Sequence, residues 1–322
     1  MSTSPAPLWG PTRFAENGPV RVAFDALAEG ADGEPLLIAT GLGANRHWVP
    51  DGLCRMLAAE GFAVARYDQR DGGESTHLPP SPTAARNPIS ALLAKGSGRG
   101  LAPYTAEDMA DDAVAVMNDL GWRSAHLVGV SLGGAVVQRV ALRHPDRVRT
   151  LTTVSAVPGD VAGLRALRYV RLGTLAKFAR LKFPDTREGT IEAGVAVSRL
   201  LASPHRPFDE RAARAAAEGN ADRGIHDQQA QSRQIGARWH GPPISAVARP
   251  TLVLHGADDP LIKLRAGRVV AARIPGARLL VLPDVGHELP EPAWPVLAAE
   301  IRKHAADSAP RTPGATPGGR ER

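Results

Sequence analysis

The sequence predicts an α/β fold in which a mostly parallel sheet is flanked by helices and carries an inserted helical cap. Short β-branched and leucine-rich runs alternate with helical patterns along most of the chain, which is typical of a parallel sheet. One long segment, residues 158–245, has helical patterns and no strand, so it interrupts that alternation. The chain has 322 residues, of which 43% are hydrophobic, and this suffices for one large core with an insertion.

Seven strands are expected, each a short run of aliphatic or β-branched residues. Their ranges are 21–26, 35–39, 62–67, 125–130, 149–155, 250–255 and 278–283. The clearest helices cover residues 106–120 and 292–304, and a further helix is expected around Cys54.

This alternation divides the chain into a core in two parts and an insertion. Residues 20–157 form the first part of the core, residues 158–245 the helical cap, and residues 246–305 the second part. Residues 306–322 lack apolar anchors and are expected to form a disordered tail. Residues 79–103 are rich in proline and glycine, which predicts a mobile loop beside the strand ends.

A serine lies between the fourth strand and the helix that follows it, where residues 127–140 read LVGVSLGGAVVQRV. The pattern Gly129-x-Ser131-x-Gly133 suits a tight strand-to-helix turn, because the two glycines remove Cβ atoms that would collide. A glycine turn without chemistry could have the same five residues. The strand and helix patterns on either side favour a nucleophile, with Ser131 exposed at the strand end.

A serine nucleophile needs a base, since its own pKa leaves almost no alkoxide near neutral pH. Two later strands end in residues of the required types. The segment HGADDP, residues 255–260, follows one of them, and PDVGHE, residues 283–288, follows the other. The order serine, acid, histidine is that of α/β-hydrolases.

On these motifs the chain resembles a serine hydrolase of the α/β-hydrolase superfamily from about residue 20 to residue 304. The resemblance implies that Asp259 is the catalytic acid and His287 the base, with Asp258 as the reserve candidate for the acid. The two aspartates could instead form only a turn and a helix N-cap. Their position between Ser131 and His287 in the expected order favours the catalytic assignment.

Acyl transfer also requires backbone amides that stabilise the oxyanion. The turn at the serine supplies the amide of Leu132. By resemblance the second amide belongs to Leu42, although the preceding residues are Thr-Gly where many relatives have His-Gly. Because the donor is a backbone group, we expect it to be retained. Gly41 and Trp48 are expected to line the substrate pocket, although an ordinary core position would suit Trp48 equally well.

The segment Asp68-Gln69-Arg70-Asp71-Gly72-Gly73-Glu74-Ser75 is similar to the D-x-R-G-x-G-x-S turn of many α/β-hydrolases, with Asp71 in place of the first glycine. Buried aspartate and arginine side chains after a strand commonly tie loops together by charge-assisted hydrogen bonds. We expect this segment to be architectural and to lie outside the chemistry.

Composition bears on partners and location. The net charge is +6, but the arginines are spread along the chain and no nucleic-acid motif or basic arm is present, so no nucleic-acid partner is expected. Cys54 is the only cysteine and cannot form an internal disulfide. The absence of a signal-like or membrane-spanning run predicts a cytoplasmic protein without stable membrane insertion. No metal or cofactor is expected, and the oligomeric state is left open.

The expected function is hydrolysis of a small-molecule carboxylic ester. The blocks LLIATGLG, RYDQRDGGEST, GVSLGG and PTLVLHGADDPL are similar to those of bacterial carboxylesterases, including polyketide (anthracycline) methylesterases, which implies a methyl ester as one candidate substrate. Serine rather than aspartate at the nucleophile position argues against epoxide hydrolase and haloalkane dehalogenase chemistry. Two alternatives stay open: a C–C bond hydrolase or perhydrolase of the same fold, and a non-hydrolytic cyclase or ligand-binding protein on this scaffold.

Overall fold

One eight-stranded sheet forms the centre of the molecule, with strand order β1-β2-β4-β3-β5-β6-β7-β8. The structure is a computed structural model that describes residues 9–27, 33–79, 102–221 and 230–308. The strands are β1 (Arg13–Asn17), β2 (Val20–Leu27), β3 (Glu34–Ala39), β4 (Phe62–Tyr67), β5 (Ala125–Val130), β6 (Val148–Val154), β7 (Thr251–Gly256) and β8 (Arg278–Leu282). The strands β3 to β8 run parallel, whereas β1 and β2 form an antiparallel hairpin whose second strand pairs antiparallel with β4.

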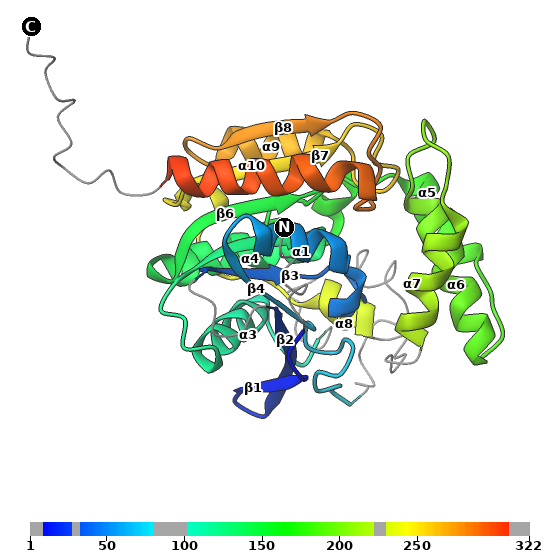
Figure 1. The fold of residues 1–322 in the computed structure, drawn as a ribbon, viewed down its shortest axis with the longest axis horizontal. Coiled ribbons are helices and arrows are strands. Elements are labelled where there is room, and N and C mark those ends of the chain that lie inside the picture. Colours follow the sequence, from blue (N-terminus) through cyan, green and yellow to red (C-terminus); the bar gives the residue numbers. More distant parts are fainter. Residues whose placement is uncertain (1–8, 28–32, 80–101, 222–229, 309–322) are drawn as a thin grey trace, which may run out of the picture.

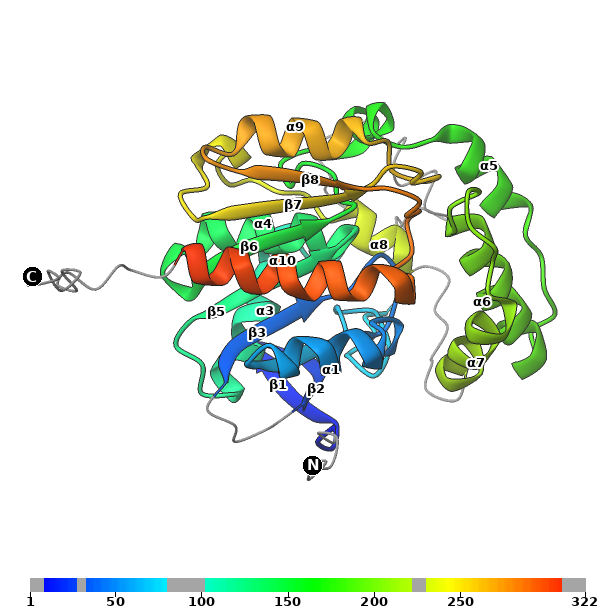
Figure 2. The same cartoon turned by 45° about the horizontal axis from the view of Figure 1, so that its top comes forward.

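Helices cover both faces of the sheet (Figure 2). The helices α1 (Asp51–Ala59) and α10 (Trp294–Asp307) share one apolar cluster with one face of the strands. The helices α3 (Ala106–Asp119), α4 (Leu132–Arg143) and α9 (Arg265–Arg273) cover the other face. Consecutive side chains of β3 therefore pack into different apolar clusters, because alternate side chains of a strand point to opposite faces of the sheet.

The chain leaves the sheet between β6 and β7 to form a separate group of helices. They are η3 (Gly163–Arg168), α5 (Leu172–Arg180), α6 (Arg187–Leu201), α7 (Glu210–Ala221), α8 (Ala230–Gly236) and η4 (Ile244–Ala246). We call α5, α6 and α7 the cap helices. Figure 1 shows them beyond the end of the sheet to which β8 points, with α8 between them and the core. The exact domain boundaries stay a prediction.

All seven predicted strands and the three predicted helices are present, and wherever bounds were predicted the ends differ by no more than three residues. The helix α10 continues to Asp307, two residues into the predicted tail, and residues 309–322 lie outside the described residues. Most of the predicted mobile loop, residues 80–101, also lies outside them.

One strand, β1, was missing from the prediction. Gly18 and Pro19 form the two-residue turn of its hairpin with β2, and Gly18 has a φ of 59°. Glycine is favoured as the first residue of such a turn because it adopts positive φ without strain. The strand before the turn, RFAEN, has too little apolar alternation to be recognised.

No helix in the described ranges combines the length and apolar character that a membrane span needs.

Candidate active site

Ser131 lies between the end of β5 and the first residue of α4, in a backbone conformation that side chains rarely adopt. Its φ is 55° and its ψ is −116°. The flanking glycines are required there, since a Cβ on Gly129 would lie 2.3 Å from the Gly133 oxygen and a Cβ on Gly133 would lie 2.1 Å from the Ala39 oxygen. The crowding inferred from the sequence is therefore present on both sides of the serine.

Asp259 and His287 meet where the loops after β7 and β8 lie together. Oδ2 of Asp259 is 2.8 Å from Nδ1 of His287. The other carboxylate oxygen accepts the backbone N–H groups of Leu261, at 2.8 Å, and Ile262, at 2.7 Å. Both side chains are buried. The carboxylate thus has three bonds that hold it against the imidazole.

The surroundings of Asp259 keep it ionised. Burial raises its pKa, but the charge and hydrogen bond of His287 and the amide of Ile262 lower it more, so the net pKa lies below the ordinary value. An ionised carboxylate at Nδ1 selects the imidazole tautomer with the proton on that nitrogen. In that tautomer the lone pair of the imidazole is on Nε2, which bonds to none of the described residues.

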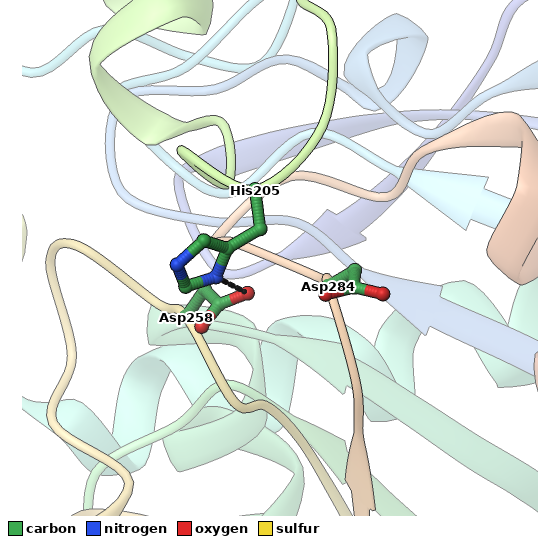
Figure 3. Close-up of side chains that lie close together, drawn as sticks. All are labelled: His205, Asp258 and Asp284. Carbon is green, nitrogen blue, oxygen red and sulfur yellow. Dashed lines mark ion pairs between the residues drawn. The ribbon is translucent and has the colours of Figure 1, made fainter.

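Asp258, the reserve candidate for the acid, faces His205 (Figure 3). Its Oδ2 is 2.9 Å from Nδ1 of His205 and accepts the Ser203 hydroxyl at 2.9 Å. The ligand atoms of His205, Asp258 and Asp284 lie within 4.8 Å of one another, so their donor set could hold a metal ion. The His205–Asp258 ion pair accounts for the convergence of two of these side chains without one.

Ser131 is at the same edge of the sheet, because it follows a strand parallel to β7 and β8. Within the described residues its side chain forms no hydrogen bond, so the Ser131–His287 hydrogen bond is not closed in this structure. Catalytic hydrogen bonds are often long before substrate binds. The structure therefore brings the predicted acid and base together, while the side chain of the predicted nucleophile forms no hydrogen bond within the described residues.

The two predicted oxyanion donors and the two predicted pocket residues lie where β3 ends and α4 begins. No acceptor in the described part of the chain takes the backbone N–H of Leu42 or of Leu132. A Cβ on Gly41 would lie 3.5 Å from the Cβ of Ser131, so this loop borders the predicted nucleophile. The ring of Trp48 lies 3.9 Å from where a Cβ on Gly194 of α6 would be, which places it between the core and a cap helix.

Apart from the exposed Glu74, the segment Asp68–Ser75 is buried, and its charged side chains are paired, as an architectural role requires. Asp68 forms an ion pair with Arg46 at 2.5 Å, and Arg70 forms one with Asp112 at 2.7 Å. Asp71 has a φ of 64° and pairs with Arg233 of α8 at 2.8 Å. Both Asp71 and Arg233 have fully buried side chains.

Sequence reasoning missed the contacts that join the cap helices to Asp259 and His287. Arg171 donates through Nε to the backbone oxygen of Asp259 at 3.0 Å. The backbone N–H of His287 donates to the oxygen of Leu201, the last residue of α6, at 2.8 Å. These partners are 88 and 86 residues apart in the chain, and no local signal could have revealed them.

His255 was also not identified as part of the site. It is fully buried, and its Nε2 lies 3.0 Å from the Ile262 oxygen and 3.8 Å from Oδ2 of Asp259. Burial lowers its pKa despite the bond to Ile262 and the nearby carboxylate, so the neutral ring is favoured and packs behind Asp259. The run PTLVLH that contains it gives no signal besides that of a buried strand.

Comparison with known proteins adds a family and several relatives. Residues 34–292 match the model of the family described as alpha/beta hydrolase fold. Rhodomycin D methylesterase DnrP of Streptomyces peucetius is 32% identical over 91% of this chain and 98% of its own length. The 2-hydroxymuconate semialdehyde hydrolase of Pseudomonas putida is 28% identical over 72% of this chain and 87% of its own. The solved structure of esterase RhEst1 from Rhodococcus sp. ECU1013 has a similar fold, with a TM-score of 0.66 at 19% identity over 92% of this chain and 99% of that one.

Proposed function

The chain belongs to the α/β-hydrolase fold family, and on that premise we propose that it is a serine esterase acting on a small-molecule carboxylic ester. The observation that carries the proposal is the buried Asp259–His287 pair, with Nε2 of the histidine unoccupied by the described residues. Ser131 at the same sheet edge, in its strained turn, supplies the nucleophile that this pair would activate.

In the proposed acylation step, Nε2 of His287 takes the hydroxyl proton of Ser131 while Oγ forms a bond to the ester carbonyl carbon. The carbonyl oxygen becomes an oxyanion, which the amides of Leu42 and Leu132 bind. The ester C–O bond then breaks, and the leaving alcohol takes the proton from the imidazolium. Throughout this step the Asp259 carboxylate holds the ring and stabilises its positive charge.

Deacylation repeats the same transfers with water. His287 removes a proton from a water molecule, whose oxygen attacks the acyl carbon and forms a second oxyanion. When the bond to Ser131 breaks, the serine oxygen recovers the proton from the imidazolium and the carboxylic acid leaves. With the ester and one water molecule as the reactants, both steps balance.

For the substrate we propose a methyl ester of a hydrophobic, polyketide-like metabolite. Support comes from two relatives named as rhodomycin D methylesterases, which are 32% and 31% identical over 91% of this chain. The match extends across the segment between β6 and β7, where the cap helices lie. The proposal therefore draws on more than the nucleophile, acid and base alone.

The mechanism is tested with p-nitrophenyl esters and a fluorophosphonate label on the wild type and three variants. Ser131→Ala should abolish turnover and labelling. Asp259→Asn should lower turnover by about 10⁴-fold, the loss typical of this change in a serine triad. Asp258→Asn is the matched control: it alters the adjacent carboxylate, which faces His205, and should stay within a few-fold of the wild type. Equal losses in the two asparagine variants would contradict the assignment of the acid.

The substrate proposal needs a separate screen. Methyl esters of polycyclic aromatic acids would be compared with the corresponding ethyl esters and with β-diketones of similar size. Faster turnover of the methyl esters supports the proposal. Preferential cleavage of the diketones would instead assign C–C bond hydrolysis, and binding without turnover would assign a non-hydrolytic role.

A further inference from the structure

The short helix α8 contacts the loop that holds the predicted oxyanion donor Leu42. It follows the cap helices in the chain and lies between them and the core (Figures 1 and 2). Gly43, with a φ of 64°, is packed so closely against α8 that a Cβ there would lie 2.6 Å from the side chain of Gln231. The loop thus has a helix from a distant part of the sequence directly against it.

Gln234 of α8 bridges this loop to the Asp68–Ser75 segment. Its side chain is 1% exposed. Oε1 accepts the backbone N–H of Gly43 at 3.0 Å, and Nε2 donates to the backbone oxygen of Arg70 at 2.9 Å. A reversed amide would place two donors together at one end and two acceptors at the other, so only one orientation satisfies both partners.

Three other bonds hold the same loop. Gln69 donates through Nε2 to the backbone oxygen of Thr40 at 3.2 Å, and the N–H of Ala44 donates to the oxygen of Gly41 at 3.3 Å. The Thr40 hydroxyl also donates to the backbone oxygen of Ala44, at 3.4 Å. These bonds fix the start and the width of the turn. The peptide between Leu42 and Gly43, at its tip, is held by Gln234.

The pair formed by Asp71 and Arg233 fixes α8 itself. Both carboxylate oxygens of Asp71 accept from the guanidinium at 2.8 Å, and Oδ1 also accepts the N–H of Leu78 at 2.8 Å. Asp71 occupies a left-handed backbone position at which glycine would be unstrained. The aspartate therefore accepts backbone strain and gains a buried, bidentate partner on the residue next to Gln234.

We propose that Gln234 is a positioning residue for the oxyanion hole. By holding the N–H of Gly43, it fixes the peptide that follows Leu42 and thereby keeps the Leu42 amide directed at the carbonyl oxygen of the substrate. Gln234 does not touch the reacting atoms, so it acts only through the loop. The inference rests on the proposed esterase mechanism, because it assigns the geometry of the oxyanion hole in that mechanism.

Three variants of the full chain test the role. Gln234→Met removes both bonds at similar side-chain length, and Gln234→Glu keeps an acceptor for Gly43 while losing the donor to Arg70. Thr150→Val is the matched control: it removes one buried hydrogen bond, to His126 at 2.8 Å, near the amino end of β6 and away from the site. Each variant is characterised by kcat and KM on one p-nitrophenyl ester and by inhibition with a trifluoromethyl ketone, whose serine adduct carries an oxyanion.

Gln234→Met should lower kcat by about 10- to 100-fold at little-changed KM, less than the loss of a whole oxyanion donor. Its affinity for the trifluoromethyl ketone should fall by a similar factor. Gln234→Glu should retain more of both than Gln234→Met, and Thr150→Val should retain all of both. If Gln234→Met keeps kcat and inhibitor affinity within twofold of the wild type, the proposal is wrong.

Amide hydrogen exchange gives a readout that needs no substrate. Peptides that cover residues 40–44 should exchange faster in Gln234→Met than in the wild type and the Thr150→Val control. Unchanged exchange in this loop would overturn the proposal even if activity fell. If the wild type turned over no ester, the esterase assignment would fail, and the exchange experiment would still decide whether Gln234 holds the loop.

Discussion

The backbone conformation at Ser131, the proposed nucleophile, predicts that the Ser131→Gly variant is more stable than the Ser131→Ala variant. Ser131 has a φ of 55° and a ψ of −116°, and alanine would inherit the same strain because it keeps the Cβ atom. Glycine adopts this conformation without the steric cost. The comparison of Ser131→Gly with Ser131→Ala thus isolates the backbone, since neither variant has a hydroxyl group.

The expected difference in the free energy of unfolding can be estimated from three contributions, one that favours glycine and two that oppose it. A residue held in a sparsely populated backbone region costs about 1–3 kcal/mol, which glycine relieves. Glycine loses about 0.5–1 kcal/mol through the greater conformational freedom of the unfolded chain. The lost methyl group is only half-buried at this site, so it removes roughly half of the ~0.8 kcal/mol of a buried methylene. The net result is a stabilisation of about 1 kcal/mol in favour of glycine.

The assay is urea unfolding of both variants, followed by tryptophan fluorescence, with the free energies compared at equal m-values. A thermal scan should place Ser131→Gly about 2 °C above Ser131→Ala. The control is Ala115→Gly in the interior of α3, where the same loss of a methyl group should destabilise the protein by about 1 kcal/mol. If Ser131→Gly is no more stable than Ser131→Ala while the control behaves as expected, the turn is not strained and the reasoning fails.

Three further outcomes follow from other parts of the structure. Gly41→Ala should fold with stability within about 1 kcal/mol of the wild type, because its Cβ would make an ordinary 3.5 Å contact with Ser131. Its kcat/KM should nevertheless fall at least about tenfold, because the methyl group narrows the access of substrate to Ser131. An unchanged kcat/KM would contradict this. Burial raises the pKa of the Cys54 thiol to about 12, so a thiol reagent at pH 8 should label it only after unfolding. Rapid labelling of the folded protein would be inconsistent with the buried site. Three buried histidines have lowered pKa values because burial disfavours their charged form, so below about pH 6.5 the unfolded chain binds protons that the folded protein does not. Urea unfolding should therefore show that the free energy of unfolding falls by up to about 4 kcal/mol from pH 7.5 to pH 5.5. Equal or greater stability at the lower pH would refute this. These histidines are His126, His255 and His304.

The turn at Ser131 was predictable because its sequence signal is local: Gly129 and Gly133 are within two residues of the serine. A Cβ on Gly129 would collide with the backbone of the same turn, whereas one on Gly133 would collide with the end of the neighbouring strand β3. The strand ends that carry Asp259 and His287 were predictable for a related reason. Parallel strands place their carboxyl ends at one edge of the sheet, so chain order alone brings the loops together.

Other features depended on contacts that no short stretch of sequence encodes. The sequence offers Asp258 and Asp259 as neighbours of the same chemical type. The difference between them arises from His205, which pairs with one, and His287, which pairs with the other. The partner of Asp71 is equally distant, since Arg233 is 162 residues away in the chain. Such pairings depend on how the cap helices and α8 return to the core.

The bond between the backbone N–H of His287 and the oxygen of Leu201 has a consequence for protein engineering. Exchanging the helical insertion between relatives is an obvious way to transplant substrate preference. A graft that replaced everything between β6 and β7 would also discard the carbonyl that supports the histidine loop, the Arg206 partner of Glu288 and the helix α8. Junctions that retain residues 201–206 and 230–236 from the recipient would preserve these contacts. A chimera built in this way could bind a different molecule while the side chains proposed to react keep their positions.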